Sequence, residues 1–213
     1  MKVVIFGATG LSGKVILKEA LSKNHQVTIL VRNAKDVTLQ DENLTVVQGS
    51  VLDRNTVNEV LKNQDAVIQS LGVGGKGNGK PTTFVSDANK IIIEEMQKTN
   101  VKRYIAMSNI GAGDSYSYLP WIFRILILPY FMKWLQVIVD DKNRMEPMIM
   151  KSNLDWTIVR SAGMADKPAK GTISTSLDGK GLKFTITLTD LAKFIVAQLE
   201  DMKFIKKAPS VSN

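Results

Sequence analysis

The chain has 213 residues, of which 44% are hydrophobic and 23% are charged; this composition fits a folded globular protein and excludes disordered and collagen-like classes. It contains no cysteine and a single histidine, His25, which excludes disulfides, thiolate chemistry and zinc sites built from His and Cys. The formal net charge is +8, but the basic residues are scattered, so we interpret them as a solvated surface and expect no nucleic-acid partner. No charge-free run reaches the length of about 18 residues that a membrane span needs, and the start of the chain does not resemble a signal peptide. We therefore expect a cytoplasmic protein with no membrane span.

Short β-branched runs alternate with helical stretches in the first half of the chain. The expected strands are 3–6, 27–31, 44–47, 66–68 and 103–107, and the expected helices are 12–22, 56–61 and 83–99. This alternation predicts βαβ units and an α/β fold of Rossmann type, a doubly wound parallel sheet with helices on both faces. Because no linker or repeat is visible, we expect a single domain over 1–213. Its cofactor-binding half would cover about 1–110 and its substrate-side half about 111–205.

The second half is less regular. It predicts a helix over 140–151, a strand over 156–159, a hairpin over 172–187 that turns at 177–181, and a closing helix over 189–199. Residues 118–135 are strongly apolar and aromatic; core packing, a lid over a substrate and a contact surface for a partner or a membrane all stay open for them. Residues 72–80 hold five glycines and predict a mobile loop.

A glycine-rich motif, Gly7-Ala8-Thr9-Gly10-Leu11-Ser12-Gly13, follows the first buried strand and opens the first helix. This is the context that a dinucleotide-binding fingerprint requires. Gly7 permits a tight turn, Gly10 lets the backbone approach a pyrophosphate, and Gly13 lets the helix pack close to the strand. The N–H groups at the start of the helix would then face the phosphates.

A basic residue stands at the end of the second strand. An acidic residue there would bind the 2′-hydroxyl of an NAD ribose, whereas this chain has Arg32, followed by Asn33 and Lys35. A guanidinium suits a 2′-phosphate by its charge and its bidentate geometry. We therefore expect NADP as cofactor, with NADPH preferred over NADH.

These residues resemble the atypical short-chain dehydrogenase/reductase superfamily, and within it the NAD(P)H-binding group that contains biliverdin-IXβ reductase/flavin reductase and NmrA-like proteins. The resemblance covers residues 1 to about 200 and implies a Rossmann fold with the dinucleotide across the carboxyl edge of the sheet. The segments that carry it, besides the glycine motif, are Leu30-Val31-Arg32, Asp65-Ala66-Val67-Ile68, Leu154-Asp155-Trp156-Thr157-Ile158-Val159-Arg160 and Leu177-Asp178-Gly179.

The resemblance also implies roles for individual residues. Gly7, Thr9, Gly10, Leu11 and Gly13 would line the pyrophosphate, and Arg32 would contact the 2′-phosphate. Ser50 and Val51 stand where the family often has Gly-Asp beside the adenine, and Leu71 and Gly72 would border the adenosine or ribose. Ser108 and Asn109 would border the nicotinamide, and the backbone that starts at Arg160 would close over it.

The Tyr-x-x-x-Lys pair of alcohol-oxidising short-chain dehydrogenases is incomplete. Lys142 stands at the lysine position, but position 138 is Ile. Without the tyrosine acid, a hydride can still pass to a flavin or quinone that takes its proton from solvent, so that catalysis is mainly positioning. We expect a reductase of a small planar acceptor, with FMN or FAD considered as substrates, Ser108, Asn109 and Lys142 near the hydride site, and a monomer or weak dimer. A non-catalytic NmrA-like NADP(H) sensor that acts through a protein partner is the alternative; a nucleotide-sugar epimerase is disfavoured by the absent tyrosine.

Overall fold

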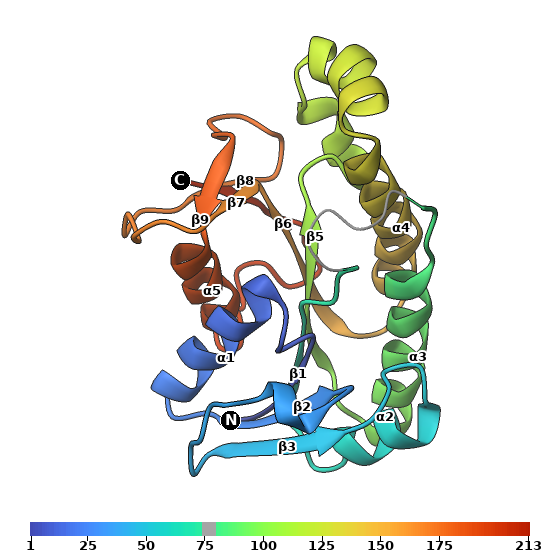
Figure 1. Cartoon of the computed structure of the whole chain (residues 1–213), viewed down its shortest axis with the longest axis vertical. Helices are drawn as coiled ribbons and strands as arrows, with labels where there is room; N and C mark the ends of the chain where they lie inside the picture. The colour runs from blue at the N-terminus through green and yellow to red at the C-terminus, as the bar shows by residue number, and fades with distance from the viewer. Residues whose placement is uncertain (74–79) are drawn as a thin grey trace.

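The computed structural model describes residues 1–73 and 80–213. Its main sheet has eight strands in the order β3-β2-β1-β4-β5-β6-β10-β8 (Figure 1). The strands are parallel from β3 to β10, and β8 at the edge pairs antiparallel with β10. The predicted Rossmann-type α/β fold is therefore confirmed. The expected mobile loop over 72–80 falls mostly on residues 74–79, which lie outside the described residues.

The first half contains the eight elements that the sequence predicts, each within two residues of the expected boundaries. Residues 3–6 of the first strand are fully buried, because helices cover both faces of the sheet and the strand is apolar throughout. The elements are β1 (Lys2–Phe6), α1 (Leu11–Ser22), β2 (Gln26–Val31), the short 3-10 helix η1 (Ala34–Asp36), β3 (Leu44–Gln48), α2 (Arg54–Leu61), β4 (Ala66–Gln69), α3 (Phe84–Thr99) and β5 (Arg103–Asn109).

The second half departs further from expectation. Helix α4 begins at Lys133, seven residues before the expected start at 140. The elements are the 3-10 helix η2 (Gly113–Tyr118), the π-helix η3 (Phe123–Phe131), α4 (Lys133–Met150), β6 (Asp155–Ser161), β7 (Gly163–Ala165), β8 (Ser174–Ser176), β9 (Thr185–Thr187), α5 (Leu188–Ala197) and β10 (Ser210–Ser212).

The predicted hairpin over 172–187 is wrong. Strand β8 pairs with β10, and β9 pairs with β7 in a separate two-stranded sheet. The connection over 177–184 is longer than the usual loop of about two to five residues that joins hairpin strands. It is held by other segments instead: the Tyr118 hydroxyl donates to the Leu177 carbonyl at 2.6 Å, and the Lys183 N–H donates to Ser212 Oγ at 2.9 Å.

The helices form two layers, one on each face of the sheet. Helices α1 and α5 lie together on one face, and α2, α3 and α4 lie side by side on the other (Figure 1). Each layer closes its own apolar core, one centred on Ile5, Ile29 and Leu191, the other on Phe6, Ile92 and Tyr104. The carboxyl ends of the strands are left between the layers, and the glycine motif and the ends of β4 and β5 meet there.

Residues 121–131, which we name the apolar arm, extend beyond the sheet at the yellow-green end of the molecule (Figure 1). Leu128 is buried, but six large apolar side chains are exposed, which shows that core packing is the wrong interpretation for them. The reason is tertiary: the five α-helices already cover both faces of the sheet. The exposed side chains are Trp121, Ile122, Ile125, Leu126, Tyr130 and Phe131. Among the helices that the structure describes, none is long and apolar enough to span a bilayer.

Candidate functional site

The glycine motif forms a tight turn from β1 into α1. Gly7 has φ +86°, and a Cβ built there would lie 2.7 Å from the Ser70 carbonyl oxygen of the neighbouring segment. A Cβ at Gly13 would lie 2.0 Å from the Gly7 carbonyl oxygen, so only glycine lets α1 approach the turn this closely. Gly10 is the N-cap of α1 and its N–H donates to the Gly7 carbonyl at 3.0 Å. The tight turn at Gly7 and the close packing at Gly13 are as expected, whereas the approach of a pyrophosphate to Gly10 stays a prediction.

The start of α1 has no side-chain cap. Gly10 provides no capping side chain and the first turn carries no acidic residue, so neither supplies an acceptor to the first N–H groups of the helix. Thr9, Gly10 and Leu11 are exposed at this point. A cradle of main-chain N–H groups at a helix start fits a pyrophosphate, because the donors and the helix dipole both favour an anion.

Arg32 follows the last residue of β2, on the strand that pairs with β1 beside the glycine motif. Its side chain is exposed, and it makes no ion pair with any residue in the described ranges. Ser50 and Val51 follow the next strand, β3; the Ser50 hydroxyl accepts from the Leu52 N–H at 3.1 Å, and Val51 is buried. The structure thus brings these three residues to the same edge of the sheet as the glycine motif.

The strand order reverses direction between β1 and β4, and the chain beyond β4 borders the glycine turn. Ser70 anchors this border, because its N–H donates to the Phe6 carbonyl at 2.9 Å. Leu71 is half-buried and Gly72 is exposed. A reversal of this kind is the point at which doubly wound sheets bind ligands. The sequence analysis missed Ser70, whose only signal is its position directly after a buried strand.

Lys142 of α4 is buried under the ends of β4 and β5. Its Nζ donates to the Met107 carbonyl at 2.8 Å and to the Leu71 carbonyl at 3.3 Å. Burial lowers the pKa of Lys142 to about 8, and the carboxylates of Asp141 and Glu146 oppose this shift. The ammonium group therefore ties two adjacent strand ends together at the candidate site.

Ser108 and Asn109 end β5, next to β6. Ser108 is 1% exposed, and its Oγ has no hydrogen-bond partner among the described residues. Buried hydroxyls are rarely left unpaired, but this one is enclosed by the protein, so its lack of a partner does not by itself indicate a ligand. Asn109 is half-exposed beside it. Of the residues expected at the hydride site, Ser108 and Lys142 are buried and Asn109 is half-exposed, and their roles stay predictions.

Arg160 lies opposite Ser108 in the register of β5 and β6, and its guanidinium is already engaged. It binds Glu146 at 2.7 Å and Asp114 at 2.6 Å, and is 1% exposed. A Cβ at Gly113 would lie 2.7 Å from Arg160 Nη2, so the turn closes tightly over the group. The side chain thus fastens α4 and η2 to the sheet and is not free to bind a ligand. Glu146, which the sequence analysis missed, stands four residues after Lys142 and hence on the same side of α4.

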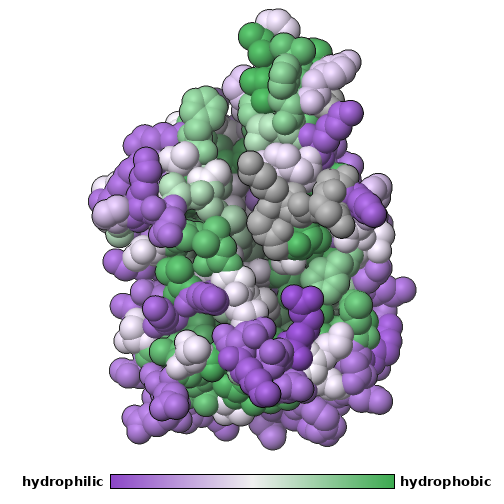
Figure 2. Space-filling view, viewed as in Figure 1, coloured by the Kyte–Doolittle hydropathy of each residue, from purple (hydrophilic) through white to green (hydrophobic). Residues whose placement is uncertain are grey.

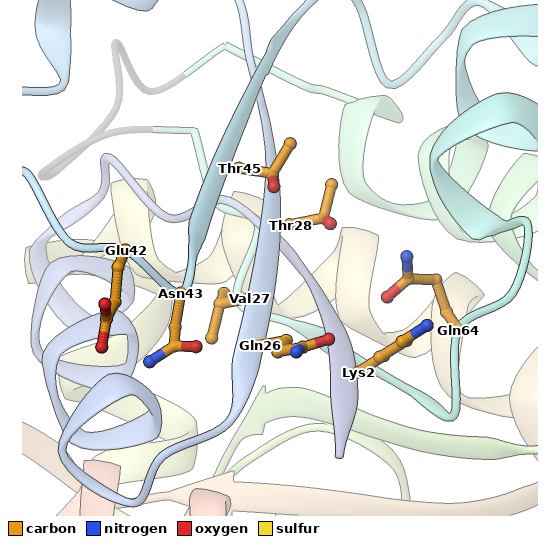
Figure 3. A pocket seen from close by; sticks show the side chains of 8 residues that line it. All are labelled: Lys2, Gln26, Val27, Thr28, Glu42, Asn43, Thr45 and Gln64. Carbon is orange, nitrogen blue, oxygen red and sulfur yellow. The ribbon is translucent and has the colours of Figure 1, made fainter.

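The structure also has a polar hollow of about 260 Å³ at the amino ends of β1, β2 and β3 (Figure 3). It is lined by Lys2, Gln26, Val27, Thr28, Glu42, Asn43, Thr45 and Gln64. The glycine motif lies at the carboxyl end of β1, so the hollow belongs to the opposite edge of the sheet. None of the expected site residues lines it.

A doubly wound sheet with a glycine turn, an open helix start and a strand-order reversal at one edge defines a dinucleotide-binding protein. A model of NAD(P)H-binding domains matches residues 7–202, and the chain belongs to this NAD(P)H-binding family. The tight turn that Gly7 and Gly13 permit and the exposed start of α1 fit such a cofactor. The family resemblance expected from the sequence is therefore confirmed.

Three comparisons show which known proteins the chain is similar to. It is 26% identical over 164 residues to the photosystem II assembly factor Ycf39 of Synechocystis, a match that covers 76% of this chain and 45% of that protein. The crystal structure of the oxidoreductase ylbE from Lactococcus lactis has a TM-score of 0.83 at 22% identity and covers 100% of this chain and 91% of its own. ChuY of Escherichia coli O157:H7, described as an anaerobillin reductase, has a TM-score of 0.81 at 21% identity, and the match covers 100% of this chain and 97% of ChuY. At these identities the solved structures show a shared fold.

Proposed function

We propose that this protein is an NADPH-dependent reductase of a small planar acceptor, most simply a flavin. The observation that carries the proposal concerns α4. Lys142 is buried at the strand ends, and the residue one turn before it is Ile138 and not a tyrosine. A reaction that needs a tyrosine acid is poorly supported by this site, whereas reduction of an acceptor that is protonated by solvent needs none.

When bound, NADPH supplies a hydride to the acceptor. The residues of the chain bind and orient: the glycine turn and the start of α1 hold the pyrophosphate, and Arg32 binds the 2′-phosphate. Lys142 fixes the ends of β4 and β5, and Ser108, buried at the end of β5, would help to shape the nicotinamide side of the site. Positioning of this kind is sufficient to accelerate hydride transfer between two bound rings.

The similarity in fold to ChuY supports a planar conjugated acceptor, because that protein is described as a reductase of an anaerobillin. Flavins and linear tetrapyrroles share an extended flat π-system, and both accept hydride without an enzymatic acid. We therefore include a tetrapyrrole beside the flavins in the assay.

The test is steady-state oxidation of NADPH, followed by absorbance, with FMN, riboflavin and biliverdin as separate acceptors. The matched control is Gly10→Val, which places a bulky side chain at the N-cap of α1, where the pyrophosphate would lie. We expect turnover by the natural sequence above the rate with the control variant. Tight NADPH binding without turnover on any acceptor would refute the reductase and leave a cofactor sensor.

A further inference from the structure

The apolar arm presents large hydrophobic and aromatic side chains to solvent. Ile125 is 66% exposed, Tyr130 69% and Phe131 74%, with Trp121 at 65%. Space-filling shows apolar surface gathered at this end of the molecule (Figure 2). A contiguous exposed apolar patch of this kind is typical of an interaction surface, because exposure of apolar side chains to water is unfavourable and these side chains lie outside the core.

Within residues 115–139, which contain the apolar arm, the charged side chains have one sign, and Asp114 and Asp140 flank this segment. Residues 115–139 contain two charged side chains, Arg124 and Lys133, and no acidic one. Lys133 is exposed at the start of α4, and the Arg124 guanidinium lies 5.8 Å from the centre of the Tyr116 ring. The complementary surface is therefore apolar with anionic groups at its border.

A second copy of the chain does not meet this requirement. In a two-fold contact between two arms, each would bring the same two cations toward the other and no carboxylate to pair with them. An anionic bilayer does meet it, since its phosphates lie directly above the acyl region that apolar side chains enter. Trp and Tyr are also the residues that favour the headgroup level, with an apolar ring and a polar N–H or O–H.

We propose that the apolar arm is a membrane-surface anchor, which inserts Trp121, Ile125 and Phe131 into the headgroup region of an anionic bilayer while Lys133 contacts lipid phosphate. The arm lies at one end of the long axis of the molecule (Figure 1), so a flat surface can reach it without touching the sheet. The π-helix η3 has nine residues, too few for a span of about 20, so the arm lies on the bilayer surface.

Sedimentation of the full chain with vesicles tests the proposal. One set of vesicles is phosphatidylcholine alone, and the other contains phosphatidylcholine and phosphatidylglycerol in equal parts. We expect binding to the anionic vesicles to be at least about tenfold stronger, because each basic residue near the surface contributes a factor of roughly five. The double variant Trp121→Ala, Phe131→Ala should lose at least about tenfold in this binding. The matched control is Phe184→Ala, since Phe184 is 81% exposed but lies outside the arm.

A pair of charge variants and a fluorescence measurement keep the test independent of folding defects. Lys133→Glu should weaken binding to anionic vesicles, while Lys193→Glu on the exposed side of α5 should weaken it less. In a Trp134→Phe background, Trp121 and the buried Trp156 are the remaining tryptophans, so a blue shift of emission on adding anionic vesicles reports insertion of Trp121.

The proposal is overturned if neither vesicle binds, if the arm variants bind as well as the natural sequence, or if the emission of Trp121 does not shift. Self-association that the double variant abolishes, without vesicle binding, would likewise overturn it and identify a second copy as the occupant. None of these outcomes depends on the reductase activity, so the anchor and the proposed function stand or fall separately.

Discussion

Arg32 is the residue whose replacement tests the cofactor assignment most directly. Its side chain is exposed, follows β2 beside the glycine motif, and has no ion pair within the described ranges. Arg32→Ala should therefore change the free energy of unfolding by no more than about 0.5 kcal/mol, as is usual for surface positions. Any large change in cofactor affinity would then report a lost contact with the ligand.

The size of the expected effect follows from the bond that would be lost. A hydrogen bond to a charged group contributes roughly 1.5–3 kcal/mol, and each 1.4 kcal/mol corresponds to a factor of about ten in affinity. Arg32→Ala should weaken NADPH by about tenfold to a hundredfold and leave NADH nearly unchanged, because NADH has no 2′-phosphate. Arg32→Asp should reverse the preference, since a carboxylate repels the phosphate and accepts from the ribose hydroxyls.

Calorimetric titration of both cofactors into the natural sequence and the two variants measures these constants, with Lys35→Ala as the matched control at a neighbouring exposed lysine. Equal affinities of NADH and NADPH for the natural sequence would refute the reasoning. An equal loss of affinity for both cofactors in Arg32→Ala would also refute it. A selective loss of NADPH affinity in Lys35→Ala would assign the phosphate contact to Lys35 instead.

Three further predictions concern the site and its supports. Gly13→Ala should abolish NADPH binding in calorimetry and lower Tm by at least about 5 °C, because its Cβ would lie 2.0 Å from the Gly7 carbonyl oxygen; unchanged binding would contradict the cradle. Lys142→Met should remove a pH dependence: the folded pKa of about 8 lies below the ordinary 10.5, so the unfolded chain binds more protons between these values. In chemical denaturation, the free energy of unfolding of the natural sequence should rise relative to that of the variant by on the order of 3 kcal/mol as the pH increases from about 8 to 10.5. A difference between the two proteins that does not change with pH would argue against burial of the charge. Glu146→Ala should lower the free energy of unfolding by about 3 kcal/mol, because Arg160 is buried and would lose one of its two carboxylate partners. Glu94→Ala, which removes an exposed ion pair, should lower it by less than about 1 kcal/mol, and equal losses in chemical denaturation would show that burial does not matter there.

The proposed division into a cofactor half of about 1–110 and a substrate half of about 111–205 stays a prediction. The fold is consistent with it in one respect, because the glycine motif, Arg32 and Ser108 all belong to the first half. Lys142 comes from the second half yet reaches the ends of β4 and β5. The two halves therefore share the candidate site, as they would if the second half positions an acceptor over the first.

The first half was readable from the sequence because its signals are local. A run such as Val3 to Phe6 is apolar at every position only when both faces of a strand are covered, which predicts a parallel sheet directly. The glycines at 7, 10 and 13 are likewise local requirements, since each relieves a close approach of backbone to backbone within a few residues of chain or to the adjacent strand. The order and type of these elements followed from the local pattern of apolar and polar residues along the chain.

The second half was decided by contacts between distant segments, which no local pattern records. Strand β8 pairs with β10 rather than with β9, and the ends of the connection between β8 and β9 are held by Tyr118 and Ser212. The aromatic run over 118–135 looked equally suited to a core, a lid or a contact surface; it became an exposed arm because the helices already cover both faces of the sheet. The sequence by itself determined the dinucleotide-binding fold and the position of its glycine turn, since those depend on short-range geometry. Only the tertiary structure decided that the Arg160 guanidinium is engaged by carboxylates, that Ser108 is buried, and that the apolar arm is exposed to solvent. Each of these depends on which remote groups fill the space around the side chain.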